Sequence, residues 1–221
     1  MTTRNGLKTA DVVFHAFNRA VRGTVLFDSP KDYLAFERIV AEAVRRFGMR
    51  IICYSVMPNH WHFILWPHED FQLSKFMHWM ELTHAMRWTV SHNVAGTGAV
   101  YQGRFKAIPV QTNNYLITAC RYVERNALTS FLVPKAEEWQ WCSLYSRCNS
   151  RYVIPLHEWP ILRPSDWIKL VNEPQTQAEV LALKKALQKG TPFGSKEWQK
   201  RIADDLGLQK TLRSQGRPKS E

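Results

Sequence analysis

The chain has 221 residues, and its 45% hydrophobic and 22% charged residues are ordinary for a globular protein. No apolar run approaches the ~20 residues of a membrane span, which argues against an integral membrane protein. The formal net charge of +11 and the pI near 9.7 are unusual. They favour a polyanionic partner, nucleic acid before an anionic membrane surface.

The hydrophobic pattern predicts alternating strands and helices up to residue 128. Strands are expected over residues 11–21, 49–57, 61–66 and 105–111, and helices over 30–47, 72–93 and 113–128. Pro109 in the fourth strand indicates an edge or an irregularity. This order predicts an α+β sandwich in which helices flank a largely antiparallel central sheet.

His60 and His62 form the most informative pair in these elements. Side chains alternate along a strand, so both imidazoles share one face while Trp61 and Phe63 point to the other. Two imidazoles on a rigid strand can hold two positions around one divalent metal. Satisfied core histidines or a surface pair are the plainer interpretations.

The expected helix over residues 113–128 offers partners for this pair. Tyr122 and Asn126 lie four residues apart, so they share one face of the helix. An amide oxygen beside a phenol could complete a His-His-Asn metal site with a nucleophile next to it. Tyr115 is the rival nucleophile, but Ala119, four residues later, cannot ligate metal, which favours Tyr122. An ordinary amphipathic helix is the plainer interpretation.

Several sequence blocks together resemble the single-tyrosine HUH transposases (His-hydrophobic-His), and more narrowly the REP-associated tyrosine transposases. The block Val-Met-Pro-Asn-His-Trp-His carries the signature. The blocks follow the family's order over about residues 8–150, and they occupy residues 14–19, 56–62, 101–106, 121–126 and 139–143. The tail over 175–219 is similar to an extension that some members carry.

The sequence of this chain differs from the family pattern at the turn after Asn126. Family members usually continue Asn-Pro-x-Arg-Ala-Gly-Leu-Val, whereas this chain continues from Asn126 with Ala-Leu-Thr-Ser-Phe-Leu-Val. The proline and the glycine are therefore missing where the helix should stop.

The resemblance implies that His60, His62 and Asn126 bind metal and that Tyr122 attacks DNA. It implies Mg²⁺ or Mn²⁺ as cofactor, and imidazole ligands suit Mn²⁺ better. The expected reaction cleaves and rejoins single-stranded or hairpin DNA, of the palindromic-repeat type, by transesterification through a 5′-phosphotyrosine. The oligomeric state, monomer or homodimer, stays open.

Two other functions compete with this enzyme. One is a protein that binds DNA hairpins but has lost cleavage. The other is a metal hydrolase that uses an activated water, although the sequence offers no further strong metal ligands for it.

Basic residues near these blocks are candidates for DNA contacts. Arg104 and Lys106 are the first candidates for binding phosphate, and Arg121 and Arg125, which flank Tyr122, come next. A solvated surface charge is the competing interpretation for each. Three other histidines are interpreted as surface or helix-face residues: His68, His78 and His84.

Several prolines follow the sequence blocks that carry the resemblance, and we place a domain boundary near residue 173. Residues 1–173 would form the catalytic domain, and residues 174–221 a basic helical extension with a disordered tail. The extension has 10 Lys and Arg against 5 Asp and Glu, a net charge of +5. Its helices, over 179–189 and 196–206, would form either a DNA-touching module or a solvated hairpin packed on the core.

The cysteines and the first residues of the chain indicate in which cellular compartment the protein is expected. The four cysteines form no Cys-x-x-Cys pair, and the first residues lack the apolar core of a secretory signal. We expect reduced thiols and a cytoplasmic protein. The cysteines are Cys53, Cys120, Cys142 and Cys148.

Overall fold

The computed structural model describes residues 9–213, so the last eight residues of the predicted disordered tail lie outside it. Four strands form one sheet in the order β2-β3-β1-β4, and every neighbouring pair is antiparallel. The predicted α+β class with an antiparallel sheet is confirmed. The strands are β1 (Val13–Arg19), β2 (Arg50–Met57), β3 (His60–Trp66) and β4 (Lys106–Val110).

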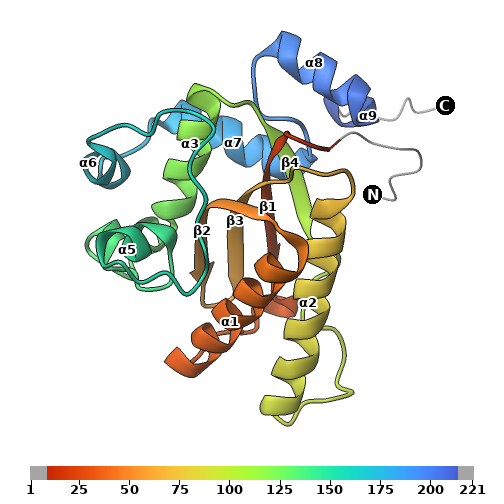
Figure 1. Ribbon diagram of the computed structural model, residues 1–221, viewed down its shortest axis with the longest axis vertical. Coiled ribbons are helices and arrows are strands. Elements are labelled where there is room, and N and C mark those ends of the chain that lie inside the picture. The colour runs from red at the N-terminus through yellow and green to blue at the C-terminus, as the bar shows by residue number, and fades with distance from the viewer. Residues whose placement is uncertain (1–8, 214–221) are drawn as a thin grey trace, which may run out of the picture.

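Helices cover both faces of the sheet (Figure 1). None of those within residues 9–213 is long and apolar enough to cross a lipid bilayer. The α-helices are α1 (Pro30–Phe47), α2 (Gln72–Ser91), α3 (Asn114–Glu124), α4 (Asn126–Thr129), α5 (Ser143–Cys148), α6 (Trp167–Asn172), α7 (Gln177–Lys189), α8 (Lys196–Asp205) and α9 (Gln209–Leu212). Two short 3₁₀ turns, η1 (Val21–Gly23) and η2 (Ala136–Glu138), complete the elements.

The bounds of α1 follow from its sequence. The backbone N–H of Ser29 donates to the Asp32 carboxylate at 2.9 Å, which satisfies a group at the helix start, and Pro30 suits the first turn. The helix ends at Gly48, whose φ of +65° is the left-handed conformation that glycine adopts without steric cost. The predicted range, 30–47, is confirmed.

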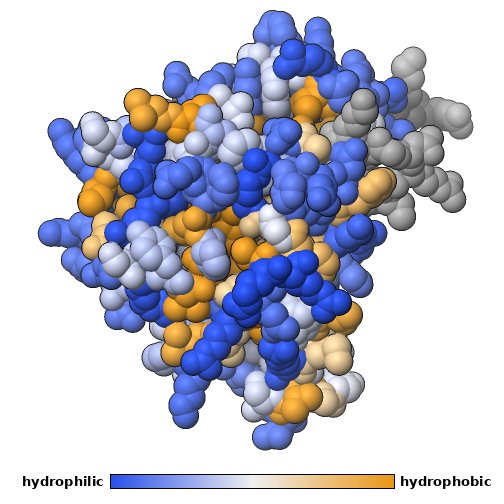
Figure 2. Space-filling model, in the orientation of Figure 1, coloured by the Kyte–Doolittle hydropathy of each residue, from blue (hydrophilic) through white to orange (hydrophobic). Residues whose placement is uncertain are grey.

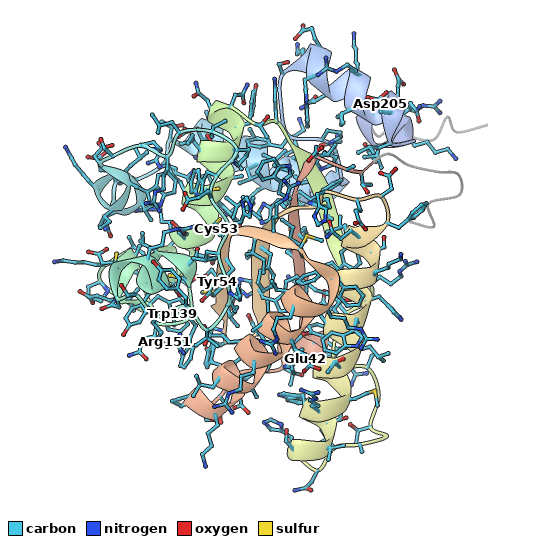
Figure 3. The ribbon with its side chains drawn as sticks, in the orientation of Figure 1. Glu42, Cys53, Tyr54, Trp139, Arg151 and Asp205 are labelled. Atoms are coloured by element: carbon cyan, nitrogen blue, oxygen red, sulfur yellow. The ribbon has the colours of Figure 1, made fainter. Side chains whose placement is uncertain are left out.

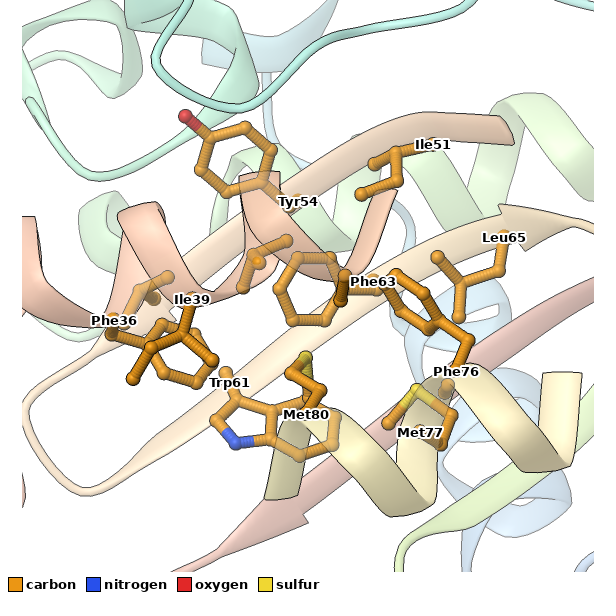
Figure 4. Packing of buried hydrophobic residues seen from close by; sticks show 14 of the residues in the cluster. Phe36, Ile39, Ile51, Tyr54, Trp61, Phe63, Leu65, Phe76, Met77 and Met80 are labelled. Atoms are coloured by element: carbon orange, nitrogen blue, oxygen red, sulfur yellow. The ribbon is translucent and has the colours of Figure 1, made fainter. Parts of the chain in front are cut away.

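The two faces of β3 enter different cores. Trp61, Phe63 and Leu65 point into the layer formed by α1 and α2, where they are fully buried. Their neighbours come from both helices (Figure 4): Phe36, Ile39, Phe76, Met77 and Met80. The surface over this layer is mostly hydrophilic, with hydrophobic residues gathered near its middle (Figure 2).

The opposite face of the sheet packs on α3. Ile64 of β3 shares a buried cluster with Leu116, Cys120 and Val123. This arrangement places α3 directly across from the side of β3 that carries the two histidines. The helix predicted over 113–128 is interrupted at Arg125, between α3 and α4.

The segment that follows α4 covers the β2 edge of the sheet (Figure 3). The backbone N–H of Val56 donates to the Trp141 carbonyl at 2.9 Å, and that of His157 donates to the Ile51 carbonyl at 2.8 Å. Beneath this segment, the fully buried Glu37 pairs with Arg151 at 2.7 Å.

The C-terminal extension covers the other edge, β4. The backbone of Phe193 pairs in parallel with Val110, donating to the Pro109 carbonyl at 2.8 Å and accepting from Gln111 at 2.9 Å. The edge position that Pro109 indicated is thus confirmed. α7 contributes Leu183 and Leu187 to the α3 core. Ile202 of α8 and Leu206, which follows it, join the α1 and α2 core.

A substitution at Gly194 tests whether the C-terminal extension packs on β4, because there is no room for a side chain at this position. A Cβ atom would lie 2.4 Å from the Trp198 ring and 2.8 Å from the Gln111 amide oxygen. We expect Gly194→Ala to lower the free energy of unfolding by about 1–3 kcal/mol and to expose α8 to protease. Thermal denaturation and limited proteolysis measure both effects, and unchanged values in both would refute the docking.

Candidate active site

β3 holds the two histidines on the face that looks toward α3. The rings of His60 and His62 have centroids 5.3 Å apart and are nearly perpendicular, at 87°. In the sheet, His60 pairs with Arg19 and His62 with Phe17 of β1. The Phe17 ring stacks on His62 at 5.6 Å, and only 6% of His62 is exposed.

α3 and α4 bring the predicted partners to this pair. The Tyr122 ring lies 5.8 Å from His62, at an interplanar angle of 89°. Asn126 begins α4 and is buried, and its side chain lies close enough to His60 to raise the pKa of that imidazole. Two imidazoles, a phenol and an amide therefore converge. Tyr115, the rival nucleophile, packs instead on Phe193 with ring centroids 5.0 Å apart.

Hydrogen bonds fix the orientation of both imidazoles. The Nδ1 atom of His60 lies 2.7 Å from Oδ1 of Asn59. A carbonyl oxygen only accepts, so His60 donates from Nδ1 and its Nε2 keeps a free lone pair. Nδ1 of His62 lies 2.9 Å from Nε2 of His15. In both rings, Nδ1 is engaged within the protein and Nε2 is left over.

Sequence reasoning missed the roles of His15 and Asn59. Asn59 precedes the histidine pair directly, but no local pattern shows that its side chain reaches the His60 ring. His15 is opposite Ile64 in the sheet, two residue pairs from His62 and therefore on the same face. The strand periodicity of β1 gives its face, but its proximity to His62 needs the β1–β3 register.

Burial sets the charges of the site. It lowers the pKa of His60 to about 4, although the Asn126 side chain opposes this shift and Arg19 adds to it. It lowers the pKa of His62 well below the ordinary 6.5, with help from the neighbouring His15 and His60, and raises the pKa of Tyr122. At neutral pH the imidazoles are therefore neutral, the form that binds metal, and the phenol keeps its proton.

The donor set suits a divalent ion. No group of three or more His, Cys, Asp and Glu side chains in the described part of the chain is placed to hold a metal. A third protein donor beside His60 and His62 would therefore be of another kind, and the amide oxygen of Asn126 is one such group. Two imidazole nitrogens and one amide oxygen match the preferences of Mn²⁺ and are compatible with Mg²⁺.

Basic side chains flank the histidines along the sheet. Exposed Lys106 of β4 pairs with Phe17, which pairs with His62, so all three lie in one row on the site's face. Arg19, which sequence reasoning missed, is exposed beside His60, and its Nε donates to the Gln102 side chain at 2.8 Å.

Arg104 lies outside this row, in the loop before β4. It is exposed, and its positive charge lowers the pKa of Glu81 on α2, against the larger effect of burial. Because nothing buries its guanidinium, Arg104 is free to meet a phosphate that approaches this end of the sheet.

Arg121 and Arg125 use their guanidinium groups within the fold. Arg121 is buried and donates to the carbonyls of Leu170 and Glu173, at 3.0 and 3.2 Å. Arg125 donates to the Val171 carbonyl at 2.7 Å. Both thus hold the C-terminal end of α6, and a DNA phosphate would have to compete with these carbonyls.

His84, interpreted from the sequence as a surface or helix-face residue, lies on the buried face of α2 and not at the surface. It is 3% exposed, and its Nδ1 lies 2.6 Å from the Tyr101 hydroxyl, which also accepts from Nε1 of Trp61 at 3.1 Å. The inward face of α2 carries His84 into the core, where the phenol satisfies its polarity. This network ties the loop before β4 to β3.

The turn after Asn126 shows how the helix ends although this chain lacks the glycine of the family pattern. Phe131 stands where the family pattern has glycine, and it adopts φ +56° with 96% of its surface exposed. Left-handed backbone is costly for a residue with a Cβ. The helix still stops, with the Leu132 N–H bonded to the Ala127 carbonyl at 3.0 Å.

A family model described as IS200-like transposase matches residues 11–126, more than half of the chain. The chain belongs to this family of transposases. Its fold is similar to that of a REP-associated tyrosine transposase solved in complex with a REP hairpin. The TM-score is 0.52 at 17% identity, over 80% of this chain and 99% of that one. A search of curated proteins finds no match. The resemblance predicted from the sequence is confirmed.

Buried histidines make stability depend on pH. Burial lowers the pKa of His15 and of His84 to about 3. The unfolded chain takes up protons near pH 6.5 and the folded one does not, so stability falls as pH drops below 6.5. Each such histidine contributes about 1.4 kcal/mol per pH unit. Glu81, whose pKa burial raises to about 7, acts in the opposite direction and offsets part of this loss.

We therefore expect the melting temperature to fall between pH 7.5 and 5.5, and to fall less in His84→Gln, which removes one of the titrating groups. Thermal denaturation across this range measures the slope for both proteins. Equal slopes would show that His84 takes up a proton without unfolding.

Proposed function

We propose that this transposase cleaves and rejoins single-stranded or hairpin DNA by transesterification, through a 5′-phosphotyrosine on Tyr122. The observation that carries the proposal is the convergence of Tyr122 and Asn126 with His60 and His62, from elements far apart in the sequence. Tyr115, the other tyrosine of α3, has no such surroundings.

In the cleavage step, the Tyr122 oxygen bonds to phosphorus and loses its proton to solvent. The bond from phosphorus to the 3′ oxygen breaks, and that oxygen takes up a proton to leave a 3′-hydroxyl. A second 3′-hydroxyl can reverse the step and join strands, because the phosphotyrosine conserves the energy of the phosphodiester. Burial keeps the phenol protonated at rest, so the proton must leave as the bond forms.

Nε2 of His60, Nε2 of His62 and the amide oxygen of Asn126 would hold a divalent metal, Mg²⁺ or Mn²⁺. When bound, such an ion offsets negative charge on the phosphate. Neutral imidazoles are ready for this role, because their lowered pKa values prevent protonation near pH 7.

The substrate is proposed from charge and from the solved relative. The net charge of +11 attracts a polyanion, and Lys106 and Arg19 flank the histidines where a phosphate backbone would lie. Arg104 lies outside this row but is exposed in the loop before β4, whereas Arg121 and Arg125 would need to leave α6 to contribute. The relative was solved with a REP hairpin, so we propose hairpin DNA of that palindromic kind.

A hairpin-binding protein without cleavage is the second candidate. The observation that favours it is the altered turn after Asn126, where Phe131 holds a left-handed backbone. Because this turn follows the proposed ligand by a few residues, a shift there would loosen Asn126 while leaving the basic residues in place.

A labelled hairpin oligonucleotide with Mn²⁺ distinguishes these functions. We expect a covalent protein–DNA adduct on a denaturing gel, lost in Tyr122→Phe and retained in Tyr115→Phe, the matched control on the same helix. Binding without an adduct in the wild type would support the second candidate. Cleavage that survives Tyr122→Phe would indicate an activated water and overturn the tyrosine mechanism.

Asn126→Ala tests the third ligand. We expect it to raise the Mn²⁺ concentration needed for half-maximal cleavage by about tenfold or more, because one of three protein donors is lost. Hairpin binding in a gel-shift assay should change little. Asn126→Asp, which keeps an oxygen donor, is the matched control. Normal cleavage by Asn126→Ala at limiting Mn²⁺ would exclude Asn126 as a ligand.

A further inference from the structure

His15 lies behind the histidine pair, on the side away from solvent. It is fully buried, and its Nε2 lies 2.9 Å from Nδ1 of His62. Its ring also contacts the Phe17 and Tyr122 rings, each at 6.1 Å between centroids. A single side chain thus touches both a proposed metal ligand and the proposed nucleophile.

The bond between His15 and His62 couples the protons of the two rings. A neutral imidazole has one N–H and one lone pair, so one ring donates and the other accepts. If His62 donates from Nδ1, its Nε2 carries a lone pair toward the site. If His15 donates instead, Nε2 of His62 carries a proton and cannot bind metal.

The second nitrogen of His15 indicates that the bond has a purpose beyond packing. Its Nδ1 is buried and has no hydrogen-bond partner. A buried polar atom without a partner costs stability, and an apolar residue would avoid that cost. Retaining a histidine here makes physical sense if its other nitrogen performs a task.

We propose that His15 is a positioning residue of the active site, which accepts the Nδ1 proton of His62 and so presents the Nε2 lone pair of His62 to the metal. This inference rests on the proposed function, in which His62 is a ligand. His60 shows the same arrangement in simpler form, because the Asn59 oxygen accepts its Nδ1 proton at 2.7 Å. Partners of this kind fix the tautomer and the orientation of metal-bound histidines.

Mn²⁺ affinity, measured from the EPR signal of the free ion, tests the role without DNA. We expect His15→Leu to weaken Mn²⁺ binding about 10- to 100-fold. His15→Gln, whose amide oxygen reaches about as far as Nε2, should restore most of the affinity. Ile108→Val is the packing control, because Ile108 pairs with His15 on β4 and lies on the same buried face.

His62→Ala separates this inference from the proposed function. If His62→Ala binds Mn²⁺ as the wild type does, the proposed metal site itself is wrong. If His62→Ala loses binding while His15→Leu keeps it, only the role of His15 is refuted.

The protonation of the wild-type rings gives a readout that needs no variant. In ¹⁵N-histidine-labelled protein saturated with Mg²⁺, two-bond ¹H–¹⁵N spectra should show the proton of His62 on Nδ1 and that of His15 on its own Nδ1. A proton on Nε2 of His62 would overturn the proposal.

Discussion

The register of β3 between β2 and β1 decides which side chains meet. Because side chains alternate along a strand, one register sends Trp61 and Phe63 into the α1 and α2 core and both histidines toward α3. A slip by one residue would bury the imidazoles among aromatic rings and turn the indole toward the helix. The bond from Trp61 to the Tyr101 hydroxyl, at 3.1 Å, opposes such a slip, since it has a polar partner only in this register.

A buried carboxylate holds the end of α3 against α5 and α6. Glu124 lies between Tyr122 and Asn126 in sequence and is fully buried. It accepts from Arg147 at 2.8 Å and from the Trp167 indole at 2.6 Å. A buried charge is tolerated only when it is paired and hydrogen-bonded, so any rotation of α3 that broke these bonds would be expensive. The same bonds therefore fix the end of α3, which carries Tyr122 and is followed by Asn126 at the start of α4.

The sequence predicted those parts of the fold that depend on local patterns. The period of two along β3 gave the shared face of His60 and His62, and the period of four gave that of Tyr122 and Asn126. The sequence alone could not show which residue of β1 lies beside His62, because this depends on strand pairing across 47 residues of chain. The contact of His15 with His62 was therefore missed. His84 was misjudged for a related reason, since its partner comes from a distant loop.

Both edges of the sheet are covered by segments made late in synthesis. Phe193 pairs along β4, and the backbone around Trp141 and His157 pairs along β2. A ribosome that has completed Val110 has produced every strand but none of these covers. Until these segments have emerged, the nascent chain presents open strand edges that can pair with other chains, and the β4 edge stays open until Phe193 emerges. Slow translation between Val110 and Phe193 would therefore lengthen the period in which the newborn protein needs chaperones.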